Sequence, residues 1–457
     1  MDRIPVEVLL ENVLPRLSSA SILAVSATSK FFYHVVDDEV LWQTLTLRDF
    51  KLPLHSTFRQ IGWRRLYSKL WDPIVYTWGE GSNARLGHPA VNQPNYYGRY
   101  RNEPLPRELV SLRGKGIVDI IAGGYSFHVL DRNGTVWMWG MMSDWLANDE
   151  ACEEPTHVNL PVPIRSISCG RVQAMALGKD GRVFQWLNIR NPMEIVLDSA
   201  SPVVQIAAGW GFSAALTADG EVFYIPEGHH RVGFSTVNYG TEGENDDGSN
   251  AEQPKLPKKE IHEHVTLTGL LASTHMSFGK HNFGVKFTRI ACGEHFMIAL
   301  TNAGAVFKFD TSTALSFMNP LLSEHLAKFG FHTGEQDVSS SERIIGHISA
   351  FFREFAAYNR EGTVFWGDRE FNADTSPIMF SELQSGICQI SIGDWHKGAI
   401  TADGKLLTWG EPSAGALGHT TAKIKPTLVK GELANKFVFS IGFGGWHSGV
   451  LAVDLGA

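Results

Sequence analysis

A repeated pattern of strands fills most of the chain and constrains its fold more than any other feature. Each copy has an apolar strand that ends at a glycine, a second apolar strand, a turn, and a third strand with aromatic residues near its end. Eleven residues separate the first glycine from the turn glycine, from Gly123 to Gly134 in the first copy, and the same interval follows Gly170, Gly209 and Gly293. Asn-Gly and Asp-Gly turns allow positive φ at little cost, so each copy predicts an antiparallel hairpin with an additional strand. One such unit cannot bury both of its faces, and the units must therefore stack against one another.

Two more copies and two half units complete the set. In the fifth copy Phe351 stands where the others have glycine, and the sixth copy begins at Gly393. Residues 74–79 form a second half without a first, whereas residues 441–451 form a first half without a second. Joining these halves gives seven units, within the range of about 4 to 8 blades of known propellers, and removes the open sheet edge. We therefore expect a mainly β fold over residues 74–457, a seven-bladed β-propeller closed by a composite blade of N- and C-terminal strands.

The first fifty residues follow a different period. Their apolar side chains recur at helical spacing, Pro5 can occupy the first turn of a helix, and Ser18 or Ser19 can cap the next one, so we expect three short helices over residues 1–50. About 45 residues cannot enclose a stable core alone, so the apolar faces need a second surface, either a partner or the following domain. Partner binding is our leading interpretation, and the residues expected to make it are Ile4, Pro5, Val8, Leu9, Val13, Leu14, Leu17, Ile22, Leu23 and Trp42.

These helices resemble the F-box. The resemblance rests on the Ile-Pro-x-Glu-Val-Leu opening from Ile4, on Val25-Ser26 with Lys30-Phe31-Phe32, and on the closing pair Leu41-Trp42. It implies binding to the linker subunit of an SCF-type cullin-RING ubiquitin ligase, and through that subunit to the cullin and RING subunits.

The repeats resemble those of the regulator of chromosome condensation family. They share its Gly-x-x-His and Asp-Gly-x-Val elements, and the Trp-Gly to Leu-Gly-His element recurs at residues 78–88 and 409–419. Taken as a whole, the chain is similar to fungal proteins of the SCF-associated-factor kind. That resemblance implies a substrate receptor whose propeller binds a protein substrate for ubiquitination and proteasomal degradation. The alternative is guanine-nucleotide exchange on a Ran-like small GTPase, the activity of the propeller family's founding member.

Composition narrows the partners and the compartment. A formal net charge of -8 argues against a nucleic-acid partner, because affinity for phosphate backbones is carried largely by Lys and Arg. The four cysteines include no C-x-x-C pair, which indicates a reducing compartment. Glu7 and Glu11 interrupt any signal-peptide core, and no run of 18 apolar residues occurs. We expect an intracellular protein, cytoplasmic or nuclear, without a membrane partner.

No catalytic motif is found in the sequence. Phosphate-binding glycine loops, H-E-x-x-H and G-x-S-x-G are all absent, so we expect a non-catalytic adaptor with no cofactor and no metal. His396 and His447 lie three residues after a repeat glycine. The family resemblance gives histidine at that position a structural role in the blade. Cys169 and Cys292 precede repeat glycines and are expected to be small buried strand residues.

Residues just after each repeat glycine vary from copy to copy while the flanking strands stay alike. Equivalent loops of a propeller gather on one face near the central channel, and variable side chains on a repeated scaffold give a specific surface. Trp and Arg at such positions are typical anchors of protein interfaces. We predict a substrate-binding face formed by Tyr125, Arg171, Trp210, Glu294, Arg353, Asp394, Trp395 and Trp446, with the basic aromatic loop at 95–101 as a second candidate.

The remaining segments connect or interrupt these units. Trp63, Leu66, Tyr67 and Leu70 predict a connecting helix within a linker at 51–73. Insertions are expected at about 226–286 and 310–343, and the spacing of Leu322, Leu326 and Phe329 in the second suggests a short amphipathic helix.

Overall fold

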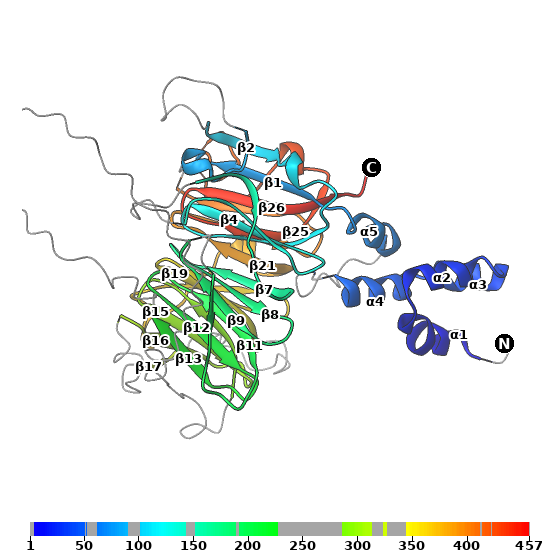
Figure 1. The fold of residues 1–457 in the computed structure, drawn as a ribbon, viewed down its shortest axis with the longest axis horizontal. Coiled ribbons are helices and arrows are strands. Elements are labelled where there is room, and N and C mark those ends of the chain that lie inside the picture. Colours follow the sequence, from blue (N-terminus) through cyan, green and yellow to red (C-terminus); the bar gives the residue numbers. More distant parts are fainter. Residues whose placement is uncertain are drawn as a thin grey trace, which may run out of the picture.

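The computed structural model describes residues 4–50, 52, 62–89, 101–142, 151–188, 192–226, 286–312, 323–326, 344–411, 414–421 and 423–456. Residues 227–285 of the predicted insertion at 226–286, the loop at 95–101 apart from Arg101, and most of the insertion at 310–343 lie outside the described residues. Figure 1 shows the N-terminal helices projecting from one end of a β structure.

The expected N-terminal helical module is confirmed, and side-chain caps mark where its helices begin. Ser18 Oγ accepts a hydrogen bond from the Ser21 amide at 3.1 Å, Ser29 Oγ accepts from Phe32 at 3.2 Å, and an Asp38 carboxylate oxygen accepts from Val40 at 2.8 Å. The helical segments are α1 (Val6–Val8), η1 (Leu9–Val13), η2 (Leu14–Arg16), α2 (Ser19–Ser26), α3 (Lys30–Val36), α4 (Glu39–Asp49) and α5 (Trp63–Lys69).

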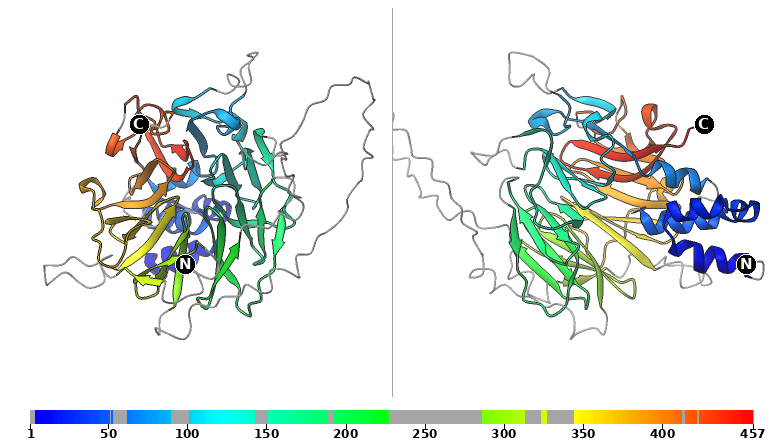
Figure 2. Two further views of the ribbon diagram at one scale, coloured as in Figure 1. Left: turned by 90° about the vertical axis from the view of Figure 1, so that its left-hand side faces the viewer. Right: turned by 45° about the vertical axis from the view of Figure 1, so that its right-hand side comes forward.

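The rest of the described chain forms seven antiparallel sheets, as the repeat predicts. Each is a blade of three or four neighbouring strands, and Figure 2 shows them arranged around a central axis. The strands are β1 (Ile74–Gly79), β2 (Glu103–Glu108), β3 (Ile117–Ala122), β4 (Ser126–Asp131), β5 (Val136–Gly140), β6 (Cys152–His157), β7 (Ile164–Cys169), β8 (Ala174–Gly178), β9 (Val183–Trp186), β10 (Met193–Ile195), β11 (Val203–Ala208), β12 (Phe212–Thr217), β13 (Val222–Pro226), β14 (Phe287–Cys292), β15 (Phe296–Thr301), β16 (Val306–Asp310), β17 (Ser323–His325), β18 (Ile345–Phe351), β19 (Glu354–Asn359), β20 (Val364–Asp368), β21 (Ile387–Ile392), β22 (His396–Thr401), β23 (Leu406–Gly410), β24 (Lys423–Leu428), β25 (Lys436–Phe443) and β26 (His447–Asp454).

The composite blade closes the ring. Its strand order is β2-β1-β26-β25, and β1 pairs with β26 in continuous register from Ile74 opposite Ala452 to Gly79 opposite His447. The first strand of each other blade, namely β3, β7, β11, β14, β18 and β21, lines a central channel together with β25. The prediction from the two half units is therefore confirmed.

The repeat glycines are explained by how closely neighbouring blades approach. A Cβ on Gly170 would lie 1.9 Å from the Gly209 carbonyl oxygen of the next blade, so no side chain fits there. That carbonyl accepts a hydrogen bond from the Arg171 amide at 3.3 Å, and the Trp210 amide donates to Gly293 in the same way at 3.2 Å. At the turns, Gly134 has φ +93, which glycine adopts without steric cost. The repeat glycines are therefore required where the backbones of neighbouring blades approach closely.

Buried histidines join neighbouring strands. His396 and His447 are 0% exposed. His447 Nε2 donates to the Ser126 carbonyl at 3.2 Å, and His396 Nε2 is 2.8 Å from Ser448 Oγ. Burial lowers the pKa of His396 to about 3 and that of His447 well below its ordinary value, so both rings are neutral in the folded state.

The two predicted cysteines are also in the blades. Cys169 and Cys292 are both buried, as expected, and burial raises the pKa of each thiol.

The prediction of a helix through Leu326 is wrong for the residues that are described. Ser323–His325 forms β17, which pairs with β16, and Leu326 is buried in the core beside it. The reason is that this blade has a fourth strand, β17, and apolar residues after the third strand can belong to such a strand instead of to a helix.

The helices and the propeller share one core. Trp63, Leu66, Tyr67 and Leu70 of the predicted connecting helix are all buried, in a cluster that extends from Trp42 through α5 to strands of the first two blades. The Glu39 carboxylate accepts hydrogen bonds from the amides of residues 62 and 63 at 2.9 and 2.8 Å, which ties α4 to the start of α5. The joint is therefore packed and hydrogen-bonded.

A cation also bridges this joint. The Arg132 guanidinium, at the turn between β4 and β5, lies 3.8 Å from the centre of the Trp71 ring and donates to the Leu70 carbonyl at 3.2 Å.

Among the described residues, no helix is both long enough and apolar enough to cross a membrane.

Candidate functional site

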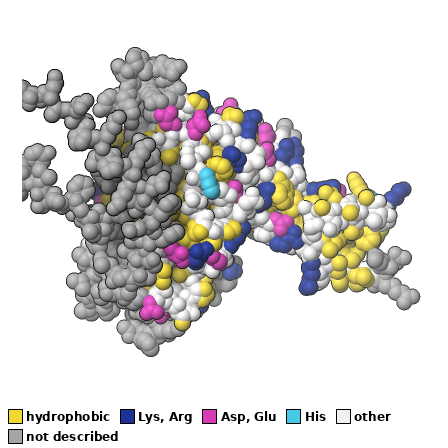
Figure 3. All heavy atoms as spheres, viewed as in Figure 1, with side chains coloured by type: hydrophobic (Ala, Val, Ile, Leu, Met, Phe, Trp, Pro, Cys, Tyr) yellow, Lys and Arg dark blue, Asp and Glu magenta, His cyan; other side chains and the backbone are white. Residues whose placement is uncertain are grey.

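The N-terminal helices carry an exposed apolar surface. Figure 3 shows hydrophobic side chains gathered over these helices at the end away from the propeller. Nine large apolar side chains in this region are between 36% and 54% exposed: Ile4, Val6, Val8, Val13, Leu23, Phe31, Tyr33, Val40 and Leu47. We call this set the helical face. Pro5 of the predicted set is exposed as well, and Leu17 is half-buried.

Four of the residues predicted to touch a partner lie inside the module instead. Leu9, Leu14, Ile22 and Trp42 are between 0% and 6% exposed and belong to the core that the helices share with the propeller. Trp42 Nε1 also donates to the Val36 carbonyl at 2.6 Å. These four side chains are too buried to contact a partner in this conformation. They form the core on which the helices of the helical face pack.

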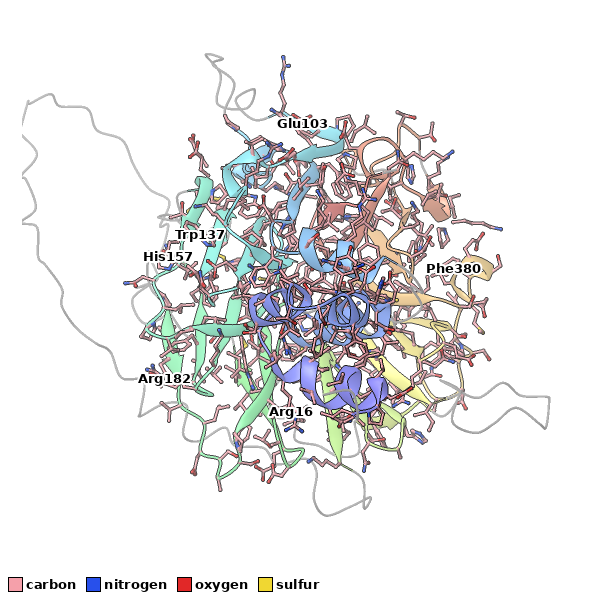
Figure 4. All side chains as sticks on the ribbon, turned by 90° about the vertical axis from the view of Figure 1, so that its right-hand side faces the viewer. Arg16, Glu103, Trp137, His157, Arg182 and Phe380 are labelled. Atoms are coloured by element: carbon pink, nitrogen blue, oxygen red, sulfur yellow. The ribbon has the colours of Figure 1, made fainter. Side chains whose placement is uncertain are left out.

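The second candidate surface is the opposite end of the propeller, where the loops after the repeat glycines meet around the channel. We call this end the mouth. The strands of the composite blade fix the geometry, because β26 starts at the mouth beside Trp446 and ends near α5. Figure 4, viewed from the helical end, shows the helices lying across the ring, with Trp137, Arg182 and Phe380 on blades around them. The helical face and the mouth therefore point in opposite directions.

A buried ion pair spans the mouth. Arg171 Nη1 lies 2.5 Å from Asp394 Oδ2, and the two side chains are only 14% and 6% exposed. Arg171 also donates to the Tyr125 hydroxyl at 2.7 Å and covers the Trp210 ring at 4.1 Å from its centre. Burial raises the pKa of Asp394, and the charge and hydrogen bond of Arg171 oppose that shift.

Aromatic rings extend from this pair. The Trp210 and Phe352 rings stack with centroids 4.6 Å apart, and the Trp395 ring meets Phe352 edge-on at 6.0 Å. Trp395 and Trp446 are 40% and 43% exposed, so both present surface to a partner. The Trp210, Phe352 and Trp395 rings come from separate blades and form a connected apolar row beside the ion pair.

A second charge group lies at the edge of that row. One oxygen of Glu294, Oε2, is 3.2 Å from Arg353 Nε and 2.8 Å from Arg369 Nη1. The Arg353 guanidinium lies 4.9 Å from the centre of the Phe352 ring. The structure thus brings the predicted mouth residues together, but it divides them into buried and accessible members.

Several residues of the mouth, among them Glu80, Phe352, Arg369 and Arg85, were missed by the sequence reasoning. Phe352 follows directly after Phe351, so its place in the repeat could have revealed it. Arg369 lies outside the position used for the prediction, and Arg85, which covers the Tyr125 ring at 5.0 Å, comes from the loop after β1. No repeat position marks these two arginines.

Comparison with known proteins agrees with both halves of this architecture. Residues 1–48 match the model of F-box-like domains. Residues 74–130 and 403–451 match the model of the regulator of chromosome condensation (RCC1) repeat, and residues 203–223 match a second model of that repeat. The chain carries an F-box-like domain and RCC1 repeats. F-box and RCC1 propeller families are in general adaptor or binding proteins, and F-box domains in general bind the linker subunit of SCF complexes.

Individual relatives cover nearly the whole chain. It is 23% identical to the F-box protein pof9 of Schizosaccharomyces pombe, over 98% of this chain and 89% of that one. It is 25% identical to the human regulator of chromosome condensation, over 83% of this chain and 91% of that protein. The crystal structure of Prp20p from Saccharomyces cerevisiae has a TM-score of 0.58 at 17% identity, covering 86% of this chain and 95% of that chain, which shows the shared fold.

Proposed function

We propose that the chain is the substrate-recognition subunit of an SCF-type cullin-RING ubiquitin ligase. Its F-box-like domain binds the linker subunit through the helical face, and its propeller binds the protein substrate at the mouth. The observation that carries the proposal is the set of exposed apolar side chains on helices whose own core is already complete. The propeller makes no bonds in the substrate but presents it for ubiquitination by a separate enzyme.

The energies are sufficient for such an interface. Burying a large apolar side chain contributes about 1.5 to 3 kcal/mol, whereas association costs roughly 4 to 15 kcal/mol. The nine side chains of the helical face are each about half exposed, so together they correspond to about four fully buried side chains, or roughly 6 to 12 kcal/mol, which is comparable with that cost. Leu9, Leu14 and Ile22 hold the helices that present them, so the face is formed before binding and little additional ordering is required.

The opposed directions of the two surfaces support an adaptor role. The helical face and the mouth are separated by the length of the blades, and the packed joint at α5 fixes their relative orientation. A substrate at the mouth does not compete for space with a linker subunit at the helices. Catalysis by such an adaptor consists of holding the substrate within reach of the transferring enzyme.

A substitution on the helical face tests the proposal. Val8 is 39% exposed on the helical face, so Val8→Glu places a charge in the proposed interface. We expect the full chain to lose linker-subunit affinity by at least about 100-fold, equivalent to about 2.7 kcal/mol. Val196→Glu is the matched control, because Val196 is 64% exposed and lies on a propeller blade. Calorimetry with purified linker subunit measures both. Equal binding by Val8→Glu and wild type would refute the assignment.

Guanine-nucleotide exchange on a Ran-like GTPase is the second candidate, and it rests on the likeness to the regulator of chromosome condensation over 83% of the chain. Two acidic side chains of the mouth, Glu294 and Asp394, are both engaged by arginines of this chain. They are therefore less available to a GTPase. A nucleotide-release assay with the full chain separates the two functions.

A further inference from the structure

Three carboxylates of the mouth are largely buried. Glu80, Glu294 and Asp394 have side chains that are 19%, 13% and 6% exposed, and each is bonded to an arginine of this chain. The arginine that reaches furthest into solvent is Arg353, whose side chain is 56% exposed. A partner that approaches Arg353 therefore meets an exposed guanidinium, while the exposed Glu370 lies at the neighbouring Arg369.

Arg353 has hydrogen-bonding capacity that this chain does not use. Its Nε contacts Glu294 Oε2, an oxygen that Arg369 also contacts, so one carboxylate serves two guanidinium groups. Within the described part of the chain, the Nη atoms of Arg353 have no hydrogen-bond partner. A guanidinium carries five N–H donors and matches a carboxylate with two parallel hydrogen bonds. Arg353 is thus positioned by Glu294 with its outer edge available.

The apolar row lies beside that edge. The Arg353 guanidinium is over the Phe352 ring, and Phe352 contacts both Trp210 and the half-exposed Trp395. Trp and Arg are the residue types that most often dominate binding energy at interfaces. A bound segment that reaches Arg353 with one side chain can place a nearby apolar side chain against Trp395.

We propose, on the basis of the proposed function, that the mouth recognises an acidic segment of the substrate. An Asp or Glu carboxylate binds the outer edge of Arg353, and an adjacent apolar residue packs on Phe352 and Trp395. The partner is a protein with a carboxylate next to an apolar side chain in an accessible segment.

One residue of this chain competes with the proposed ligand. Glu370 lies 3.2 Å from Arg369 through Oε1 and is 83% exposed. Exposed ion pairs of this kind contribute only about 0 to 1 kcal/mol, so a substrate carboxylate can displace it or bind beside it. Its negative charge nonetheless lowers the local potential. Removing the charge with Glu370→Gln should therefore strengthen binding, by up to about fivefold.

Selection from a random peptide library on the immobilised full chain tests the proposal. We expect the enriched peptides to share an acidic residue beside an apolar one. Arg353→Glu should weaken their binding by at least about tenfold, equivalent to about 1.4 kcal/mol, and replacing the peptide's acid with Lys should restore binding to that variant. Arg360→Glu is the matched control, since Arg360 is an exposed arginine of the same blade located at the turn facing away from the mouth.

Several results would overturn the proposal. Enrichment of Lys or Arg peptides would point to the buried Asp394 instead. Binding of phosphorylated peptides alone would identify a different anion as the ligand. Unchanged binding by Arg353→Glu, or the absence of any enriched peptide, would rule out the proposed site. Linker-subunit binding is measured on the same preparations. Arg353→Glu should retain it, so failure of the acidic-segment proposal is distinguishable from failure of the proposed function.

Discussion

The helical face and the mouth are built in opposite ways. At the helical face, apolar side chains that are between 36% and 54% exposed lie above a closed core. At the mouth, most side chains already contact one another, through the Arg171–Asp394 pair and the stacked rings. An apolar surface without hydrogen-bonding groups is suited to binding one constant partner that covers it. A surface with fixed charges and aromatic rings is suited to selecting among partners, because a partner with mismatched polar groups loses free energy when those groups are buried.

The largest expected effect is the loss of propeller stability in acid, which depends on histidines buried in the blades. Burial lowers the pKa values of His128 and His396 to about 3 and that of His447 well below its ordinary value, and all three lie in blades. Each unfolded ring takes up a proton near pH 6.5, whereas the buried ring in the folded state stays neutral well below that pH. Stability is therefore complete above about pH 6.5 and falls below it, by about 4 kcal/mol per pH unit for three rings.

Urea unfolding between pH 7 and 5 measures this loss. His396→Gln should reduce the slope of stability against pH, because one of the buried neutral rings is then absent. A stability that stays constant across this range would show that the propeller does not depend on neutral buried rings.

The joint between the regions gives the next largest effect. Trp63 is 1% exposed in the core between α4, α5 and the propeller, so Trp63→Ala should lower the free energy of unfolding by about 3 to 5 kcal/mol. Trp71→Ala is the control, because Trp71 is 43% exposed and should cost clearly less. Chemical denaturation followed by circular dichroism compares them. Equal losses would mean that the helices do not share a core with the blades.

The ion pair of the mouth should show strong coupling. Asp394→Leu alone leaves the nearly buried Arg171 unpaired and should cost about 3 kcal/mol. Arg171→Met combined with Asp394→Leu should recover most of this loss, because neither charge then remains unpaired. A double-mutant cycle on unfolding free energies measures the coupling. Additive losses would contradict a direct interaction across the channel.

The smallest effect is expected at a helix cap. Ser18 accepts a hydrogen bond from the Ser21 amide at the start of α2, and Ser18→Ala should cost about 1 kcal/mol. The loss should weaken linker binding slightly, since α2 carries Leu23 of the helical face, and leave peptide binding at the mouth unchanged. Calorimetry with each ligand distinguishes these effects. An equal change at both ends would show that the regions are not independent.

The repeat predicted the propeller well, because each blade's pattern depends on local turns and on contacts between neighbouring strands. The 11-residue interval and the half units at 74–79 and 441–451 were sufficient to predict seven blades and their closure. The helical face was predicted less completely. Ile22 and Leu23 are adjacent in the sequence, yet one is 0% and the other 45% exposed. Helical spacing marks apolar positions but does not say which face meets the module's own core.

The mouth shows a similar limit. Its loop positions were predictable from the repeat, whereas the pairing of Arg171 with Asp394 joins residues 223 apart in the chain and depends on the diameter of the closed ring. Arg369 reaches Glu294 from the neighbouring blade, 75 residues along the chain. Side-chain contacts between blades have no local sequence signal, and the buried and exposed members of the mouth could not be told apart.

Hydrogen–deuterium exchange of the full chain with and without purified linker subunit tests the central claim most directly. We predict that added protection is confined to residues 4–26 and to α3 and α4, with the loops at 123–126 and 393–396 unchanged. Protection at those loops, or no protection of the helices, would contradict the assignment of the two ends of the molecule to two different partners.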